Sequence, residues 1–193
     1  MSRAILLVPG WGDRSRSLRH IRSYLLRAGY AGNTIDAMEF RARFGSNIEH
    51  AEEIKAWIAR QTGIGRTIDI VAHSMGGLAV RHLLHNFPVE ASRIRRVISL
   101  GSPHAGTVVA WLGLGAGARE MRPASSFLNA LSNANTAGVD LVSLRAPFDL
   151  RILPGTSSIL SGARNYEIRC LGHRDLLRRR SVLERIRQLL EEP

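Results

Sequence analysis

A serine placed to act as a nucleophile lies in the stretch Ile70–Gly77, which reads IVAHSMGG. The apolar run before Ser74 predicts a buried strand and the residues after it predict a helix, so Ser74 falls in a tight strand-to-helix turn. Ala72 and Gly76, two positions before and after the serine, are small enough to let the strand and the helix approach each other. Such a turn exposes the hydroxyl beside a helix N-terminus, which favours negative charge. Ser74 is therefore predicted to be a catalytic nucleophile.

A serine hydroxyl needs a base, and a histidine base needs an acid that fixes its tautomer. In proteins with this turn, the acid and then the histidine follow the serine along the chain. Among the seven histidines, His173 alone follows a late strand-like run and precedes the last predicted helix, so it is predicted to be the base. His73 adjoins Ser74 and is expected to point away from its hydroxyl. Four others lie in helical patterns, where surface or packing roles are expected: His20, His50, His82 and His85.

Three aspartates compete for the role of the acid. Asp149 lies in the loop after the strand-like run Val139–Leu144, where an orienting carboxylate is expected. Asp140 lies near the start of that run and so falls at the opposite end of the sheet, and Asp175 follows His173 and is out of order. Asp149 is therefore predicted to be the acid.

Two backbone N–H groups are predicted to stabilise a developing oxyanion. One belongs to Met75, directly after the serine, and the other to Trp11, in the glycine-containing loop after the first strand-like run. The Trp11 indole is also expected to line the substrate pocket, with packing over the first loop as the alternative. Three further residues are predicted to line that pocket: His104, Trp111 and Leu112.

Short apolar runs that favour strands alternate with helical patterns along the whole chain. The predicted strands are Ala4–Val8, Thr34–Met38, Ile68–Ala72, Arg95–Leu100, Val139–Leu144 and Tyr166–Leu171. Helical faces are predicted from Leu18 to Ala28, from Ile48 to Ile58, over Gly76–Asn86, and after Ser181 as a cap. This alternation predicts a three-layer α/β fold, in which about six mostly parallel strands carry helices on both faces. One domain over residues 1–193 is expected, with its functional side chains at the carboxyl ends of the strands.

The segment 104–138 interrupts this alternation, because it is rich in Gly, Ala, Ser and Asn. Two interpretations stay open for it. A lid or pocket wall after a strand would have this composition, and so would an ordinary surface excursion with a poor helix.

The formal net charge is +11, and all but one of the basic residues, Lys55, are arginine. The arginines are scattered and lack the aromatic pattern of common RNA-binding modules, so no specific nucleic-acid partner is expected. Arg174 and the run Arg178–Arg180 follow His173. A basic rim at the site, with weak attraction to anionic esters or an anionic lipid surface, is therefore expected.

The sequence also bears on disulfides, metal sites, cofactors and cellular location. A lone cysteine, Cys170, excludes an internal disulfide and a cysteine-based zinc site, and neither a metal nor a cofactor is expected. The run Ala4–Val8 is too short for a secretion signal, and no run approaches the length of a membrane span. A cytoplasmic protein is expected, or a secreted one if the sequence lacks its true start.

Together these motifs resemble the small, capless bacterial lipases and esterases of the α/β-hydrolase superfamily. The likeness extends over nearly the whole chain and is carried by these segments: Val8–Gly12, Ala72–Gly77, Gly101–Thr107, Asp149 with Pro154, Ser157–Ser158 and Gly162–Ala163, Gly172–His173, and Leu176–Leu177. The resemblance implies hydrolysis of a carboxylic ester, on a small molecule or a lipid, without a metal or an organic cofactor. The sequence departs from the family pattern at Pro9-Gly10, where these lipases usually have His-Gly.

The sequence therefore predicts a serine ester hydrolase that uses Ser74, His173 and Asp149 and forms an acyl-enzyme. A thioesterase, an acyltransferase or a lipid deacylase on the same residues is the alternative. A basic binding protein that kept this fold without activity is a third hypothesis, disfavoured because all three residues are present.

Overall fold

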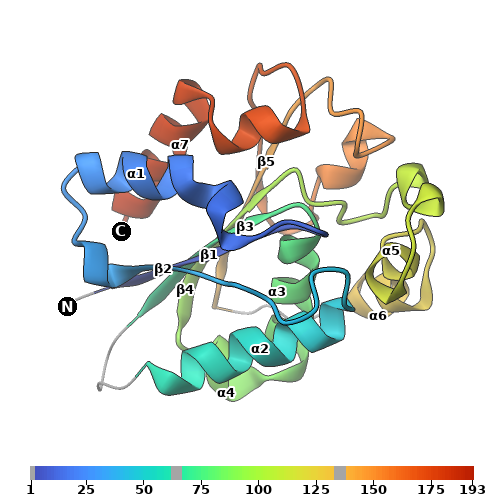
Figure 1. Ribbon diagram of the computed structural model, residues 1–193, viewed down its shortest axis with the longest axis horizontal. Helices are drawn as coiled ribbons and strands as arrows, with labels where there is room; N and C mark the ends of the chain where they lie inside the picture. Colours follow the sequence, from blue (N-terminus) through green and yellow to red (C-terminus); the bar gives the residue numbers. More distant parts are fainter. Residues whose placement is uncertain (1–2, 62–66, 133–137) are drawn as a thin grey trace.

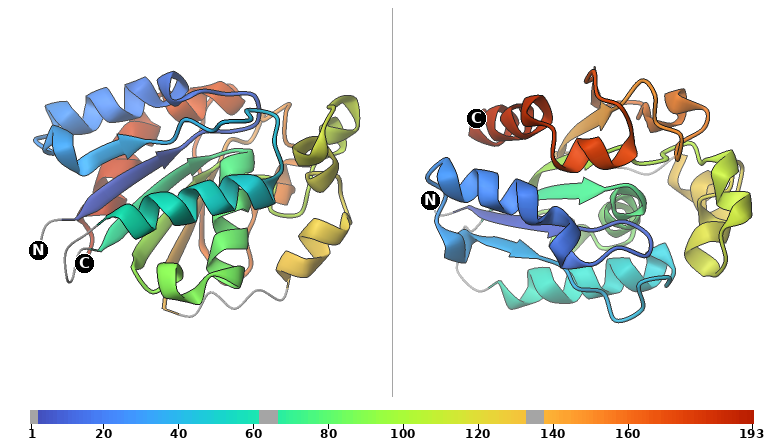
Figure 2. Two further views of the ribbon diagram at one scale, coloured as in Figure 1. Left: turned by 60° about the horizontal axis from the view of Figure 1, so that its bottom comes forward. Right: turned by 45° about the horizontal axis from the view of Figure 1, so that its top comes forward.

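The computed structural model describes residues 3–61, 67–132 and 138–193, which form a parallel sheet between two layers of helices (Figures 1 and 2). The sheet has six strands in the order β2-β1-β3-β4-β5-β6, and every pair is parallel. This confirms the predicted three-layer α/β architecture. The strands are β1 (Ala4–Val8), β2 (Ile35–Ala37), β3 (Ile68–His73), β4 (Ile94–Leu100), β5 (Asp140–Arg145) and β6 (Arg164–Glu167). The α-helices are α1 (Arg19–Arg27), α2 (Asn47–Arg60), α3 (Met75–Asn86), α4 (Pro88–Ala91), α5 (Ala116–Glu120), α6 (Ser126–Ser132) and α7 (Arg180–Glu191).

Strand β1 is apolar at every position because both of its faces are covered. Along β1 the pleat sends successive side chains to opposite faces. Ile5 and Leu7 pack in the cluster that includes the apolar stripes of α1 and α7, whereas Leu6 and Val8 pack with residues of α2 and α3. Figure 1 shows α1 and α7 on one side of the sheet, with α2 and α3 on the other. These two clusters hold the strand ends at fixed positions.

The strand order places a crevice beside β1. The chain runs from β1 outward to β2 and then returns to β3 on the other side of β1. The loops after β1 and β3 therefore leave the sheet in opposite directions, which is where parallel α/β sheets bind ligands. Ser74 directly follows β3, and Trp11 lies in the loop after β1.

The last strand differs from its prediction. Tyr166–Leu171 was the expected range, but β6 covers Arg164–Glu167 and pairs with Val142–Arg145 of β5. The strand begins earlier because the Arg164 guanidinium bonds to Asp140 at the start of β5. It ends earlier because β5 itself ends, and after Glu167 the N–H of Ile168 makes the one remaining bond, to Arg145 O.

The start of the C-terminal helix also corrects a prediction, since Ser181 does not cap it. Helix α7 begins at Arg180, and the carbonyl oxygen of Arg179 accepts from the N–H groups of Val182 and Leu183. Ser181 therefore lies inside the first turn. A side-chain cap does occur on α2, where Ser46 accepts from Glu49 N–H and the Glu49 carboxylate accepts from Ser46 N–H.

The segment 104–138 packs on the N-terminal half of α3. It contains a 3₁₀ helix (Val108–Leu112), α5 and α6, and its residues 133–137 lie outside the described part of the chain. Its apolar side chains form a third cluster with Met75 and Leu78 of α3: Ala110, Met121, Phe127, Leu128 and Leu131. None of the helices in the described ranges is long and apolar enough to cross a membrane.

Candidate active site

Ser74 occupies a strained backbone conformation between β3 and α3. Its φ of 54° and ψ of −127° lie outside the regions that residues with a side chain favour. Close neighbours hold it there. A Cβ on Gly76 would lie 2.6 Å from Pro9 O, and one on Gly10 would lie 2.9 Å from the Cβ of Ser74. Gly76 was predicted to be needed here, whereas the contact with Gly10 joins the loop after β1 to the turn and was not foreseen.

His173 and Asp149 form a short, buried hydrogen bond. The Nδ1 of His173 lies 2.6 Å from Asp149 Oδ2, and both side chains are almost completely buried. The other oxygen of Asp149 accepts the N–H groups of Arg151, at 2.9 Å, and Ile152, at 3.2 Å. This fixes the carboxylate so that it can orient the imidazole. Gly101, after β4, packs against the pair, because a Cβ there would lie 3.1 Å from both Asp149 Oδ2 and His173 Nδ1.

The two alternative acids bind elsewhere. Asp140 pairs with Arg96 and Arg164 at the amino end of the sheet. Asp175 accepts the N–H of Leu171 at 3.1 Å and pairs with Arg178 at 2.9 Å.

A second pair of ionisable residues lies beside His173 and was missed by the sequence analysis. The ring of His73 packs on that of His173, with centroids 4.5 Å apart, and Asp13 Oδ2 lies 3.7 Å from His73 Nδ1. Asp13 also pairs with Arg174 at 3.2 Å. Asp13 therefore connects the loops that follow β1 and β6 with the turn that follows β3. The sequence offered no signal for this except the position of Asp13 in the first loop.

Burial sets the charges of this second pair. It lowers the pKa of His73 to about 4, together with the nearby His173, although Asp13 acts in the opposite direction. Burial alone would raise the pKa of Asp13, but His73 and the charges of Arg174 and Arg151 outweigh it, so that this pKa lies below its ordinary value. At neutral pH the pair is thus a carboxylate beside a neutral imidazole.

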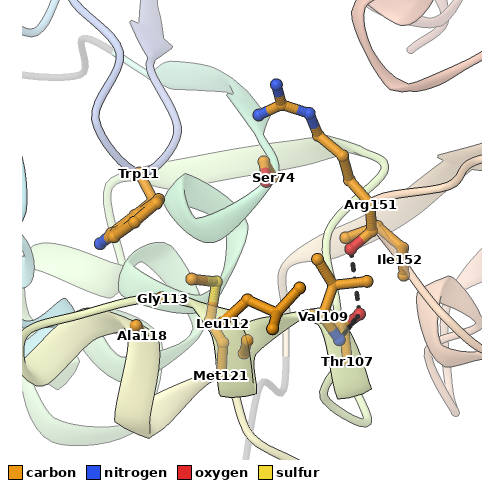
Figure 3. Close-up of a pocket in the computed structure, with 11 residues that line it drawn as sticks. Trp11, Ser74, Thr107, Val109, Leu112, Gly113, Ala118, Met121, Arg151 and Ile152 are labelled. Carbon is orange, nitrogen blue, oxygen red and sulfur yellow. Dashed lines mark hydrogen bonds between the residues drawn. The ribbon is translucent and has the colours of Figure 1, made fainter.

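A cavity of about 210 Å³ opens beside Ser74 (Figure 3). Its walls are mostly apolar, and the segment 104–138 contributes most of them. The residues that line it are Trp11, Ser74, Thr107, Val109, Ala110, Leu112, Gly113, Ala118, Met121, Arg151 and Ile152. The ring of Trp11 also packs edge-on against Phe44, at 4.9 Å between centroids, which fixes the indole at the cavity wall. Trp11 and Leu112 thus lie where pocket residues were predicted.

His104 and Trp111 differ from their prediction as pocket residues, because neither lines this cavity. His104 is buried below it, with Nε2 3.0 Å from Ser99 Oγ, and burial next to Arg81 lowers its pKa to about 3. The buried Arg81 guanidinium donates to His104 O and to Leu131 O, which ties the segment 104–138 to α3. Trp111 is 61% exposed and carries the guanidinium of Arg122 over its ring, 4.3 Å from the centroid.

The structure shows no cluster of metal-binding side chains within residues 3–61, 67–132 and 138–193. Within these ranges, no group of three or more His, Cys, Asp or Glu side chains is arranged to hold a metal ion. Ser74, Thr107 and Arg151 supply polar side chains to the lining of the cavity.

The family model for the alpha/beta hydrolase fold matches residues 3–121, more than half of the chain. The chain therefore belongs to the alpha/beta hydrolase fold family.

Solved structures of lipases and esterases share this fold. The mature form of lipase BlEst2 from Bacillus licheniformis matches with a TM-score of 0.78 and 15% identity, over 97% of this chain and 91% of that chain. Aspergillus fumigatus lipase B matches with a TM-score of 0.78 and 18% identity over 91% of this chain, which spans 49% of that lipase. Polyneuridine aldehyde esterase matches with a TM-score of 0.69 and 14% identity, over 99% of this chain and 100% of that chain. The resemblance to lipases and esterases of this superfamily is confirmed at the level of the fold.

Proposed function

We propose that the protein is a serine hydrolase of carboxylic esters. The observation that carries this proposal is the buried 2.6 Å hydrogen bond between Asp149 and His173, at the same end of the sheet as the strained Ser74 turn. An aspartate that accepts from Nδ1 leaves Nε2 of the neutral imidazole without a proton. His173 can then act as a base toward a hydroxyl.

In this mechanism Ser74 Oγ attacks the acyl carbon while Nε2 of His173 takes the hydroxyl proton. The tetrahedral intermediate collapses as the protonated His173 gives that proton to the departing alcohol oxygen, which leaves an acyl-enzyme. Water then attacks the acyl carbon with His173 again as the base, and Ser74 is released with the acid product. Asp149 stays ionised and stabilises the imidazolium in both halves of the reaction.

The negative charge on the former carbonyl oxygen requires N–H donors. The backbone N–H groups of Trp11 and Met75 have no hydrogen-bond partner among the described residues, and Met75 is the first residue of α3. N–H groups without an internal partner, one at a helix N-terminus and one in the loop after β1, can bind an oxyanion with little reorganisation. We assign them this role.

The cavity beside Ser74 supports a short acyl group as the preferred substrate. Its volume of about 210 Å³ is below the roughly 300–1,000 Å³ of common ligand pockets. Its apolar wall of Val109, Leu112 and Met121 suits a hydrocarbon chain.

A lipid ester is a second candidate substrate, and exposed apolar side chains favour it. Leu112 at the cavity is 87% exposed, and Leu150 on the loop that carries Asp149 is 78% exposed. The two segments are joined, because Val108 N–H donates to Leu153 O at 3.0 Å. An apolar surface of this kind beside a site favours contact with a lipid phase.

The test is hydrolysis of 4-nitrophenyl butyrate by the wild type and by Ser74→Ala and His173→Ala. The wild type should turn over, and each variant should lose at least a thousandfold in kcat, whereas His20→Ala on the exposed face of α1 should not change the rate. Equal rates for wild type and Ser74→Ala would refute the proposal. Matched oxygen esters and thioesters, in solution and in emulsion, then separate an esterase from a thioesterase and from a lipase.

A further inference from the structure

Arg151 places a positive charge at the mouth of the cavity. It lines the same cavity as Ser74, and in Figure 3 its guanidinium extends on the Ser74 side, away from the apolar wall formed by Val109 and Leu112. The side chain is exposed and makes no hydrogen bond or ion pair with any residue in the described ranges, although its charge helps to lower the pKa of Asp13. Among the residues that line the cavity, Arg151 alone carries a charge.

The backbone of Arg151 is fixed by the active site itself. Its N–H donates to Asp149 Oδ1 at 2.9 Å, and its carbonyl oxygen accepts from Thr107 Oγ1 at 2.9 Å. Ile152, the next residue, is 1% exposed. The guanidinium therefore extends from an anchored Cα, which reduces the entropy lost when it binds a ligand.

Three of the four arginines that follow His173 have acidic partners. Arg174 pairs with Asp13 at 3.2 Å, and Arg178 pairs with Asp175 at 2.9 Å. Arg180 pairs with Glu184 at 2.7 Å. Arg179 has no side-chain partner among the described residues but does not line the cavity, so the unpaired charge at the cavity itself comes from Arg151 in the loop after β5.

We propose that Arg151 is a specificity-determining residue that binds an anionic group on the alcohol part of the ester. The inference rests on the proposed ester hydrolase. The apolar wall accommodates the acyl chain, so the alcohol part is left on the open, charged side of Ser74. A guanidinium there can donate two parallel hydrogen bonds to a carboxylate or a phosphate. The substrate class is thus a short-chain ester of an alcohol that bears a negative charge.

The test uses two soluble esters with one acyl group, 4-(butanoyloxy)benzoate and its neutral methyl ester. The ratio of their kcat/KM values is measured for the wild type and for each variant, so that the intrinsic reactivities of the two esters cancel. Arg151→Gln should lower kcat/KM at least tenfold more for the carboxylate ester than for the neutral ester, mainly through KM. Arg151→Lys should lose less, because it keeps the charge but not the planar fork.

Arg179→Gln is the matched control, because Arg179 is also exposed and its side chain has no partner among the described residues, but it does not line the cavity. It should leave the ratio unchanged. An equal loss in both variants would assign the preference to general surface charge and overturn the subsite. An Arg151→Gln ratio equal to that of the wild type would also overturn it.

These outcomes are distinct from failure of the proposed function, in which the wild type would hydrolyse neither ester.

Vesicles of phosphatidylglycerol test whether the anion that Arg151 binds belongs to a soluble ester or to a lipid surface. A loss confined to vesicle-bound substrate, with soluble esters unaffected, would contradict a subsite for individual anionic esters.

Discussion

The two ends of the sheet use the same types of residue in opposite ways. At the amino end, acids and arginines neutralise one another: Asp69 accepts two bonds from Arg95, at 2.8 and 2.9 Å, and Asp140 pairs with Arg96 and Arg164. At the carboxyl end, the one charged side chain that lines the cavity, that of Arg151, makes no hydrogen bond or ion pair with the described residues. Paired charges stabilise the fold, whereas an unpaired charge at a cavity is free to contact a substrate.

This contrast changes the meaning of the net charge of +11. Arg95 and Arg96 also bond to main-chain oxygens near the end of α7, such as Leu190 O and Glu192 O. Their charges therefore stabilise contacts inside the protein. Composition alone could not reveal which arginines are neutralised internally, and Arg151 is the one that matters at the cavity.

The largest expected effect is on catalysis at the carboxyl end. Asp149→Asn should lower kcat by roughly 10⁴-fold, because the amide stabilises the wrong tautomer of His173, as in serine proteases. The measurement is kcat on 4-nitrophenyl butyrate, with the melting temperature as a control for folding. A loss below tenfold would mean that Asp149 does not orient the base.

The next effect is on stability, and it comes from two buried histidines at the same end. The pKa of His73 is about 4 and that of His104 about 3, against about 6.5 in an unfolded chain. The unfolded state therefore takes up protons first as the pH falls, and stability that is complete above pH 6.5 is lost toward pH 4. At pH 5 each histidine should cost roughly 2 kcal/mol of the free energy of unfolding.

Urea unfolding at pH 7.5 and pH 5 measures this loss. The pKa values of Asp13 and Asp140 lie below those of ordinary aspartates, so these acids titrate at more acidic pH and do not contribute between pH 7.5 and pH 5. In His104→Gln the difference between the two pH values should fall by about half. Equal stability of the wild type at both pH values would contradict the account.

At the amino end, a matching substitution should affect stability and leave catalysis intact. Asp140→Asn removes the charge beside the buried Arg96, and about 2 kcal/mol of stability should be lost, less than for a fully buried pair because Asp140 is 32% exposed. The rate per folded molecule should stay the same. A large fall in kcat, measured well below the melting temperature, would assign Asp140 a role at the site.

The smallest expected effect concerns Asp13, which connects the catalytic loops. Asp13→Asn should lower kcat/KM by about tenfold, or about 1.4 kcal/mol, because His73 and Arg174 lose their shared partner. Arg174→Gln should have an effect in the same direction, and the double variant should lose less than the sum of the two. Strict additivity would show that the two residues act separately. Asp13→Glu should restore part of the rate.

Much of the fold could be predicted because its signals are local. Strand β1 matches its predicted range, and β3 and β4 differ by one residue at one end, because continuous apolar runs mark strands that are covered on both faces. Strand β6 was misplaced because it lies at the edge, and its polar start depends on the distant pair of Arg164 with Asp140.

The site residues also divide into those that could be predicted from the sequence and those that could not. Position after a strand and order along the chain were enough to select Asp149 and His173, which the structure brings together. The Asp13 contacts and the unpaired Arg151 could not be predicted, because they depend on side chains from loops that are far apart in sequence. His104 was misplaced because its bond to Ser99 turns it into the protein, below the cavity.

The central claim is that Ser74 is an activated nucleophile. It is tested most directly by incubating the folded protein with a fluorophosphonate at pH 7.5 and mapping the adduct by peptide mass spectrometry. The account predicts one adduct, on Ser74, formed at least a hundredfold more slowly in His173→Ala. Folded protein that forms no adduct, or an adduct on another residue with Ser74 unmodified, would contradict it.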